Sequence, residues 1–390
     1  MDSKKYKINE VNAWNGWDPL KQVVLGNVFD TEIFENIGDH KLRDLLQQIL
    51  YETYEDLMGI KKTLEDLGVE VIQPPRNTIN YFKDNDTVYD DKNVFDLDSN
   101  MSGMTGLPRP CLTPRDHFLT LGNKLLATTI QVGDSGQTFN PKCVDMFFKE
   151  QWNLYQDGKI PHGPIKPSTN AFDMASATGE ESIFNEFTFA APVVHRVGNR
   201  LIVDVEDYTN LDKVLLERYQ EFTGANIAVG GHTDGSMNLP KPGLVICAPF
   251  MSKEDFKDSL PGWDVLRIEN PNYMRSDGDI HHWAIEKDIT KGRWWHPEAK
   301  SNPELVSFVE EWLSKWVGYA EESIFEVNML SVNEEVILSM NYQKEVHTAL
   351  KKHGIEPIYC RFRHRNFWDG GLHCLTLDTV REGGIQDYFK

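Results

Sequence analysis

Residues 114–129 read PRDHFLTLGNKLLATT, and they contain the pattern that decides the fold. Two short apolar runs flank the Gly-Asn pair at 122–123, which suits the tight turn of a β-hairpin. The same arrangement returns in residues 193–204, which read VVHRVGNRLIVD around a second Gly-Asn pair at 198–199. We therefore predict two similar hairpins in distant parts of the chain.

A second unit, a helix that ends at a glycine and is followed by a strand, occurs three times. In its longest copy, apolar residues in 41–67 recur at helical spacing, Gly68 is placed to cap the helix, and residues 69–72 resemble a strand. The other copies have Gly224 and Gly354 at the corresponding position. These units indicate an α/β protein.

The spacing of the glycines indicates internal repetition. Gly122 and Gly198 are 76 residues apart, and Gly68 and Gly224 are 156 apart, about twice that distance. The 130 residues from Gly224 to Gly354 fit only if one module is shortened. A period of about 75–80 residues would give about five modules, which could bury their faces against one another in a closed ring. Ordinary α/β units with coincidental spacing are the alternative.

The remaining segments are assigned more simply. Residues 22–25 resemble a strand, 303–317 an amphipathic helix and 324–330 a strand. Residues 76–106 and 258–302 are polar and rich in turn-forming residues, so we predict long loops that lie near a site.

Composition excludes several classes of protein. The 390 residues are 40% hydrophobic, which is enough for one large domain or two ordinary ones. The formal charge of −20 disfavours nucleic acid and anionic membrane as partners. No apolar run approaches membrane-helix length, and the N-terminus lacks the apolar region of a signal peptide, so we expect a cytoplasmic protein.

One cysteine stands out from the five in the chain. Residues 368–377 read WDGGLHCLTL, and the two glycines before Cys374 would let the backbone approach another group closely. That arrangement could hold a thiol at the mouth of a pocket, or it could bury an ordinary core cysteine. The odd count, wide spacing and absence of a CxxC pair argue against a disulfide framework or a zinc cage.

Two other stretches carry residues suited to chemistry. Residues 230–235 read GGHTDG after a predicted strand, so His232 and Asp234 would point the same way if the backbone stays extended. A histidine exchanges protons near neutral pH, although a histidine satisfied within its own loop is the commoner case. Asp116, beside Arg115, could form a salt bridge with it, which the sequence favours, or bind a substrate.

Together these residues match the chemistry of guanidino groups. A thiolate can add to an electrophilic carbon, a histidine can move protons, and carboxylates bind planar guanidinium through paired hydrogen bonds. The acidic character of the chain suits such a cation.

Four segments resemble the glycine amidinotransferase family in order and spacing, and they are spread over almost the whole chain. They read WDPLKQVVLGNV, PRDHFLTLGNKLLAT, GGHTDGSMNLPKPGLVI and GGLHCLTLDTVREGGIQDYF. The resemblance implies one domain over residues 1–390, a five-fold pseudosymmetric α/β propeller of the pentein type with ββαβ modules. It implies no metal and no organic cofactor, and a homodimer is common in that family.

The resemblance also implies roles for individual residues. Cys374 would attack the guanidino carbon of a donor, typically arginine, and leave an amidino-thiouronium enzyme. An acceptor amine would then take the amidino group. His232 would be the general acid and base, and Asp116 and Asp234 would hold the donor.

The chain departs from the family's pattern at substrate-holding positions. Where the family has an aspartate in a Phe-Asp-Ala-Ala motif, this chain has Ala190, with Glu186 nearby as a possible substitute. Where the family has a substrate-binding arginine, this chain has Met251, and near Glu326 the family has a small hydroxyl residue. We therefore expect an amidinotransferase with altered substrates. A guanidino hydrolase on the same scaffold and a catalytically lapsed binding protein are the alternatives.

Overall fold

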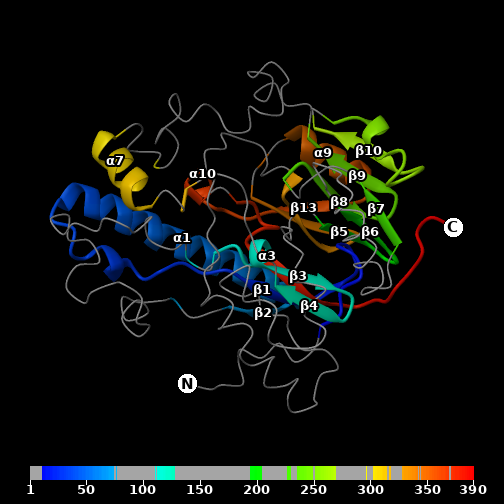
Figure 1. Cartoon of the computed structure of the whole chain (residues 1–390), viewed down its shortest axis with the longest axis horizontal. Helices are drawn as coiled ribbons and strands as arrows, with labels where there is room; N and C mark the ends of the chain where they lie inside the picture. Colours follow the sequence, from blue (N-terminus) through cyan, green and yellow to red (C-terminus); the bar gives the residue numbers. More distant parts are fainter. Residues whose placement is uncertain are drawn as a thin grey trace, which may run out of the picture.

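The computed structural model describes residues 11–73, 76, 110, 112–127, 194–203, 226–229, 235–248, 251–268, 296, 302–313, 316–317, 327–340, 342, 344–368 and 370–390. Strands in these ranges form five separate sheets (Figure 1). In strand order the sheets are β14 (Thr376–Arg381), β1 (Leu20–Leu25) and β2 (Glu70–Ile72); β3 (Phe118–Leu121) and β4 (Lys124–Ala127); β5 (Val194–Val197), β6 (Arg200–Val203) and β7 (Asn226–Val229); β10 (Asp264–Arg267), β9 (Leu244–Cys247) and β8 (Met237–Lys241); β11 (Leu330–Asn333), β12 (Val336–Ser339) and β13 (Glu356–Tyr359).

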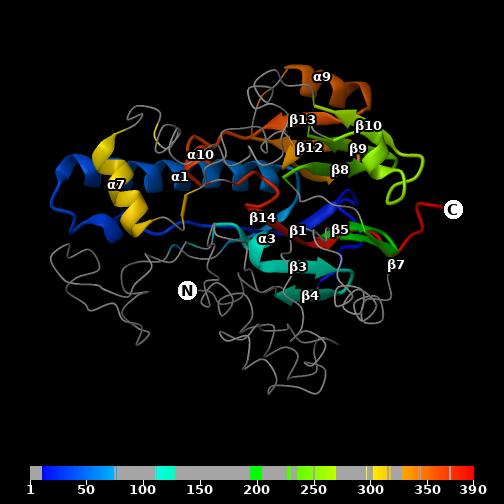
Figure 2. The same ribbon diagram turned by 45° about the horizontal axis from the view of Figure 1, so that its top comes forward.

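Helices connect or flank these sheets. The described ones are η2 (Thr31–Phe34), α1 (His40–Asp66), α3 (Pro114–His117), η6 (Lys253–Phe256), α7 (Pro303–Trp312), α9 (Lys344–Lys352) and α10 (Arg365–Trp368). Figure 2 shows α1 running beside the sheet of β1 and β14, with α9 over the sheet of β12 and β13. None of these helices combines the length and the apolarity needed to cross a membrane.

Four of the five sheets share one plan, an antiparallel pair with a parallel strand beside it. For example, β5 pairs antiparallel with β6, and β6 pairs parallel with β7. A parallel pairing needs a crossover connection. α1 lies between β1 and β2 in the chain, and α9 lies between β12 and β13. The fold is therefore α/β, and the two hairpins predicted around residues 122 and 198 are confirmed.

The glycines at these two hairpin turns let a third segment bind both of them. Gly122 and Gly198 have φ values of +55° and +64°. Gly122 exchanges two backbone hydrogen bonds with Ala13 (2.8 and 2.9 Å), and the amide of Gly198 donates to the carbonyl of Trp14 (2.9 Å). A Cβ on Gly198 would lie 2.1 Å from the carbonyl oxygen of Gln386. A side chain is therefore excluded at these turns by conformation and by space.

The hairpin turns at Gly122 and Gly198 are 76 residues apart, but the predicted period of 75–80 residues does not continue to the next hairpin. The hairpin of β8 and β9 turns at Gly243, which has a φ of +80° and follows Gly198 by only 45 residues. This module is the shortened one, because the brief η6 stands between β9 and β10 in place of a long helix. The loop expected over 258–302 also needs correction, since β10 lies within it and pairs in parallel with β9.

Local sequence signals predict the ends of α1 correctly, but they do not predict the end of α7. The side chain of Asp39 accepts hydrogen bonds from the first amides of α1, and Gly68 follows its last turn with a φ of +81°, as predicted. α7 ends at Trp312 rather than at residue 317. Leu313 leaves the helical conformation (φ −120°, ψ 19°), and Trp316 beyond it is fully buried.

The strand predicted for residues 324–330 is also wrong. Among the described residues β11 begins at Leu330, and the amide of Met329 donates to the carbonyl of Val327 (2.8 Å) in a tight turn. The apolar run therefore does not extend as a strand, for a reason that lies in the site described below.

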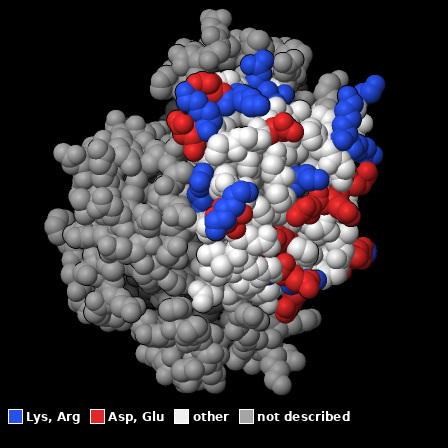
Figure 3. All heavy atoms as spheres, turned by 90° about the vertical axis from the view of Figure 1, so that its right-hand side faces the viewer, with Lys and Arg blue, Asp and Glu red and all other residues white. Residues whose placement is uncertain are grey.

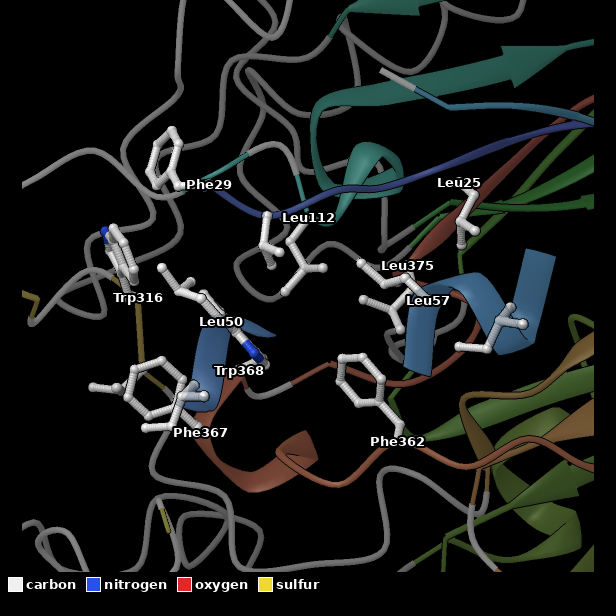
Figure 4. Close-up of a cluster of buried hydrophobic side chains, with 14 of the residues drawn as sticks. Leu25, Phe29, Leu50, Leu57, Leu112, Trp316, Phe362, Phe367, Trp368 and Leu375 are labelled. Carbon is white, nitrogen blue, oxygen red and sulfur yellow. The ribbon is translucent and has the colours of Figure 1, made fainter. Parts of the chain in front are cut away.

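The largest apolar core lies between α1 and the chain that leads to β14. In Figure 4, Leu50 and Leu57 of α1 face the same interior as Trp368 and Trp316. The rings of Trp316 and Trp368 stack with centroids 5.6 Å apart, and Trp368 Nε1 donates to Thr53 Oγ1 (2.8 Å). Trp368 lies two residues before the glycine pair at 370–371 that leads to Cys374, so this packing fixes the start of that segment.

A buried cluster of charges, here called the hub, joins distant parts of the chain. Asp378 is fully buried and accepts from Arg115 (2.6 Å), Arg196 (2.6 Å) and Arg381 (2.5 Å). Burial would raise the pKa of Asp378, but Arg196, Arg115 and Arg381 hold it well below its ordinary value. Asp378 is therefore a carboxylate in the folded protein.

The arginines of the hub also bind backbone carbonyls of other elements. Arg381 donates to the carbonyls of Asp18 (2.6 Å) and Ser331 (3.0 Å), and Arg196 donates to the carbonyl of Ala13 (3.3 Å). The hub therefore ties β14 to α3, to β5, to β11 and to the segment before β1.

The surface differs in character from the hub. In the coloured part of the face shown in Figure 3, side chains of both signs lie among uncharged ones, so this part is not uniformly acidic despite the net charge of −20.

Replacement of Asp378 by asparagine should destabilise the protein strongly, because three buried guanidinium groups would lose their carboxylate. We expect a loss of about 3–5 kcal/mol in the free energy of unfolding at pH 7, measured by denaturant titration. Asp66→Asn, which removes an exposed pair with Lys62, is the control and should leave the midpoint nearly unchanged.

The loss of unfolding free energy in Asp378→Asn should also depend on pH. Because the folded-state pKa of Asp378 is depressed, its contribution is present above the ordinary value near 3.8 and is lost as the pH falls further. The difference between wild type and variant should therefore shrink below that pH. A difference that stays constant from pH 7 to pH 3 would contradict the ionised hub.

Candidate functional site

Cys374 lies in a tight turn between α10 and β14. Its side chain is only 7% exposed. The turn is closed by hydrogen bonds from the amide of Leu375 to the carbonyl of Gly371 (3.0 Å) and from the amide of Thr376 to the carbonyl of His373 (3.2 Å). The thiol is thus presented from a rigid turn at the start of a buried strand.

Asn328 binds this turn through both ends of its side-chain amide. Its Nδ2 donates to Sγ of Cys374 (3.1 Å), and its Oδ1 accepts from the backbone amide of Cys374 (3.0 Å). Its carbonyl also accepts from the amide of His373 (3.3 Å). These contacts explain why residues 327–329 do not continue β11, since the backbone there turns to meet the cysteine.

No signal in the sequence points to Asn328. No motif marks it, it lies 46 residues from Cys374, and it falls within the apolar stretch predicted to be a strand. Only the fold brings the two residues together.

Gly371 is required by the contact between Asn328 and Cys374. A Cβ at this position would lie 2.4 Å from both Cβ and Oδ1 of Asn328, closer than real contacts allow. The prediction that this glycine pair permits a close approach is confirmed at Gly371, and the group that approaches is Asn328.

Arg115 connects the cysteine turn to the hub. Its Nε donates to the carbonyls of His373 (2.8 Å) and Thr376 (2.9 Å), on the two sides of Cys374, while its Nη2 donates to Asp378. The ion pair of Arg115 thus runs to a residue 263 positions away. Asp116 lies in α3, and its side chain is outside the part of the chain that the structure describes.

The other predicted site residues fall largely outside the described ranges. His232 and Asp234 lie in the segment between the end of β7 and the start of β8, and Ala190 and Glu186 precede β5; none of these four is described. The structure therefore brings Cys374 together with Asn328 and leaves the predicted histidine and carboxylates as expectations.

Met251 is described, and it belongs to the core. Its side chain is 1% exposed and lies in an apolar cluster with Trp17, Phe256 and Trp263. A buried apolar side chain offers no charge to a substrate carboxylate.

The other described cysteines differ from Cys374. Burial raises the pKa of Cys247 to about 12 and that of Cys360 to about 11. Both lie in apolar clusters, where a thiol is inert. Cys374 instead has an amide donor directed at its sulfur.

A small cavity lies beside the turn. It has a volume of about 40 Å³ and is bordered by Arg115, Arg196, Asn238 and His373, among others. This volume is enough for a few water molecules.

Known proteins resemble the chain over nearly its full length. A curated L-arginine:L-lysine amidinotransferase from Pseudomonas savastanoi pv. phaseolicola is 32% identical, over 97% of this chain and 96% of that protein. Inosamine-phosphate amidinotransferase 1 from Streptomyces griseus is 22% identical, over 95% and 97% respectively. No protein-family model matches the chain.

A solved structure shares the fold. It is an amidinotransferase of the saxitoxin biosynthetic pathway from Microseira wollei. It matches with a TM-score of 0.60 and 19% identity, over 97% of this chain and 99% of that one.

Replacement of Gly371 by alanine should break the contact between Asn328 and Cys374, because the new methyl group would occupy the space of the asparagine side chain. We expect a loss of thermal stability of several degrees and a changed alkylation rate of Cys374, measured by peptide mass after iodoacetamide treatment. Gly384→Ala is the matched control, since nothing lies within 4 Å of a Cβ there. Equal stability and equal alkylation in both variants would show that the close contact is not formed.

Proposed function

Because the chain belongs to the amidinotransferase family, we propose that it transfers an amidino group from a guanidino donor to an amine acceptor through a covalent intermediate on Cys374. The observation that carries the proposal is the geometry of Cys374, which combines a rigid turn, an amide donor at Sγ and a link to the hub. The relative that is 32% identical is named for transfer between arginine and lysine, which supports arginine or an analogue as donor and a primary amine as acceptor.

The proposed reaction has two balanced halves. The thiolate of Cys374 adds to the guanidino carbon, the bond from that carbon to the donor's substituted nitrogen breaks, and this nitrogen leaves as an amine with a proton from a general acid. The acceptor amine then adds to the amidino carbon of the thiouronium, loses a proton to the same group, and the carbon–sulfur bond breaks. The thiolate is thereby regenerated.

The partners of Cys374 in this mechanism are assigned by resemblance. His232 would move the proton in both halves, and Asp116 and Asp234 would hold the guanidinium group by paired hydrogen bonds. Altered substrates are proposed because Met251 is buried in the core, where it provides no charge for a substrate carboxylate.

We also propose that residues 1–390 form one domain, with the five sheets closed into a propeller of five modules. The pairing of β14 with β1 supports closure, because it joins the two ends of the chain in one sheet. The hub supports it as well, because its arginines reach elements of several sheets.

The proposed function is tested by following a labelled guanidino carbon. Wild-type protein incubated with such arginine and a set of primary amines, lysine and glycine included, should transfer the label to a new guanidino compound, detected by mass spectrometry. Cys374→Ala should lower the rate by about four orders of magnitude or more, because no covalent intermediate can form. Cys360→Ala, which removes a buried cysteine of the core, is the control and should keep activity in its folded fraction.

The position of the label decides between the two chemistries of this scaffold. Label in urea or citrulline would show that water replaces the acceptor amine, and would overturn transfer in favour of hydrolysis. Full activity of Cys374→Ala would overturn the covalent mechanism.

A further inference from the structure

We propose that Asn328 is a positioning residue that holds Sγ of Cys374 in place and stabilises its thiolate. The proposal concerns the nucleophile of the reaction proposed above and in that respect rests on it. The contact itself is independent of any substrate, because both partners belong to this chain and lie in the described part of the structure.

The orientation of the Asn328 amide is fixed by what each of its ends contacts. The backbone amide of Cys374 can only donate, so the group that faces it at 3.0 Å must be the acceptor Oδ1. Nδ2 is then the atom that faces Sγ at 3.1 Å, and it presents an N–H to the sulfur. One side chain therefore fixes the backbone of the cysteine and donates to its sulfur.

A donor at this distance favours the charged form of the thiol. A hydrogen bond to an ionised acceptor is stronger than one to its neutral form, and it shifts ionisation toward the charged form. Asn328 is fully buried, so water competes little for its amide. The thiolate is the attacking form in nucleophilic catalysis, so the contact raises the reactive fraction at neutral pH.

Asn328 is itself held on both sides. Its carbonyl accepts from His373, and the next carbonyl, that of Met329, accepts from Nδ2 of Asn238 on β8 (2.8 Å). The absence of a side chain at Gly371 leaves the room that Asn328 occupies. The asparagine therefore has little freedom to turn away from the sulfur, which is what preorganisation of a nucleophile requires.

The test is the pH dependence of Cys374 alkylation by iodoacetamide, resolved by peptide mass and measured without substrate. In Asn328→Ala the sulfur loses the donor that Asn328 supplies, so alkylation at pH 7 should slow by about tenfold to a hundredfold. The pH at which the alkylation rate reaches half of its maximum, here called the pH midpoint, should rise accordingly. In Asn328→Asp the acceptor for the backbone amide remains, but a carboxylate faces the sulfur, so the midpoint should rise further than in the alanine variant.

The matched control is Asn238→Ala, which removes a buried asparagine from the same region without touching Cys374. It should lose stability but raise the pH midpoint much less than Asn328→Ala does, because the amide donor at Sγ remains. A rise in Asn238→Ala equal to that in Asn328→Ala would overturn the proposal, because loosening of the segment would then suffice. A wild-type midpoint in folded Asn328→Asp would also overturn it, because the role of Asn328 would then be to bind the backbone alone.

The alkylation assay separates this proposal from the proposed function. Slower alkylation of both Asn328 variants supports the positioning role even if no amidino transfer is found in wild type, a result that would overturn only the proposed function. Unchanged alkylation together with active amidino transfer would overturn only the positioning role.

Discussion

The ionic contact between Asp378 and three arginines is the constraint on which the rest of the structure depends. A buried carboxylate is tolerated only where cations and hydrogen bonds replace water, and Arg115, Arg196 and Arg381 supply both. The three cations exceed the one anion, and backbone carbonyls accept further hydrogen bonds from the guanidinium groups. The chain must therefore bring strands that are distant in the sequence to one point, where the guanidinium groups contact them.

The hub also determines where the thiol lies. Arg115 binds Asp378 at one end of its guanidinium group and the carbonyls on either side of Cys374 with its Nε. The core anchors Trp368, six residues before the cysteine, and Asn328 binds the cysteine itself. Three sets of contacts thus hold the cysteine turn, and such rigidity is what a nucleophile needs to keep its geometry through a reaction.

Local features of the fold could be predicted from the sequence, and contacts between distant residues could not. The hairpin at residues 118–127 and helix α1 follow from turn chemistry and helical periodicity, both of which act within a few residues. Cys374 stood out because of the adjacent glycines. Asn328 did not, because it contacts a residue 46 positions away, and the partners of Asp378 lie as far as 263 positions away. The strand prediction for 324–330 failed at the residue that binds the thiol, where a tertiary contact overrides the local pattern.

In the proposed mechanism, the thiol of Cys374 becomes covalently bonded to the guanidino carbon of the donor. The most direct measurement is peptide mass analysis of wild-type protein quenched in acid after brief incubation with arginine or an analogue and no acceptor. We expect one added amidino group on the peptide that contains Cys374, and its loss once an amine acceptor is supplied. Turnover with no adduct on Cys374, or with the adduct on another cysteine such as Cys360, would contradict it.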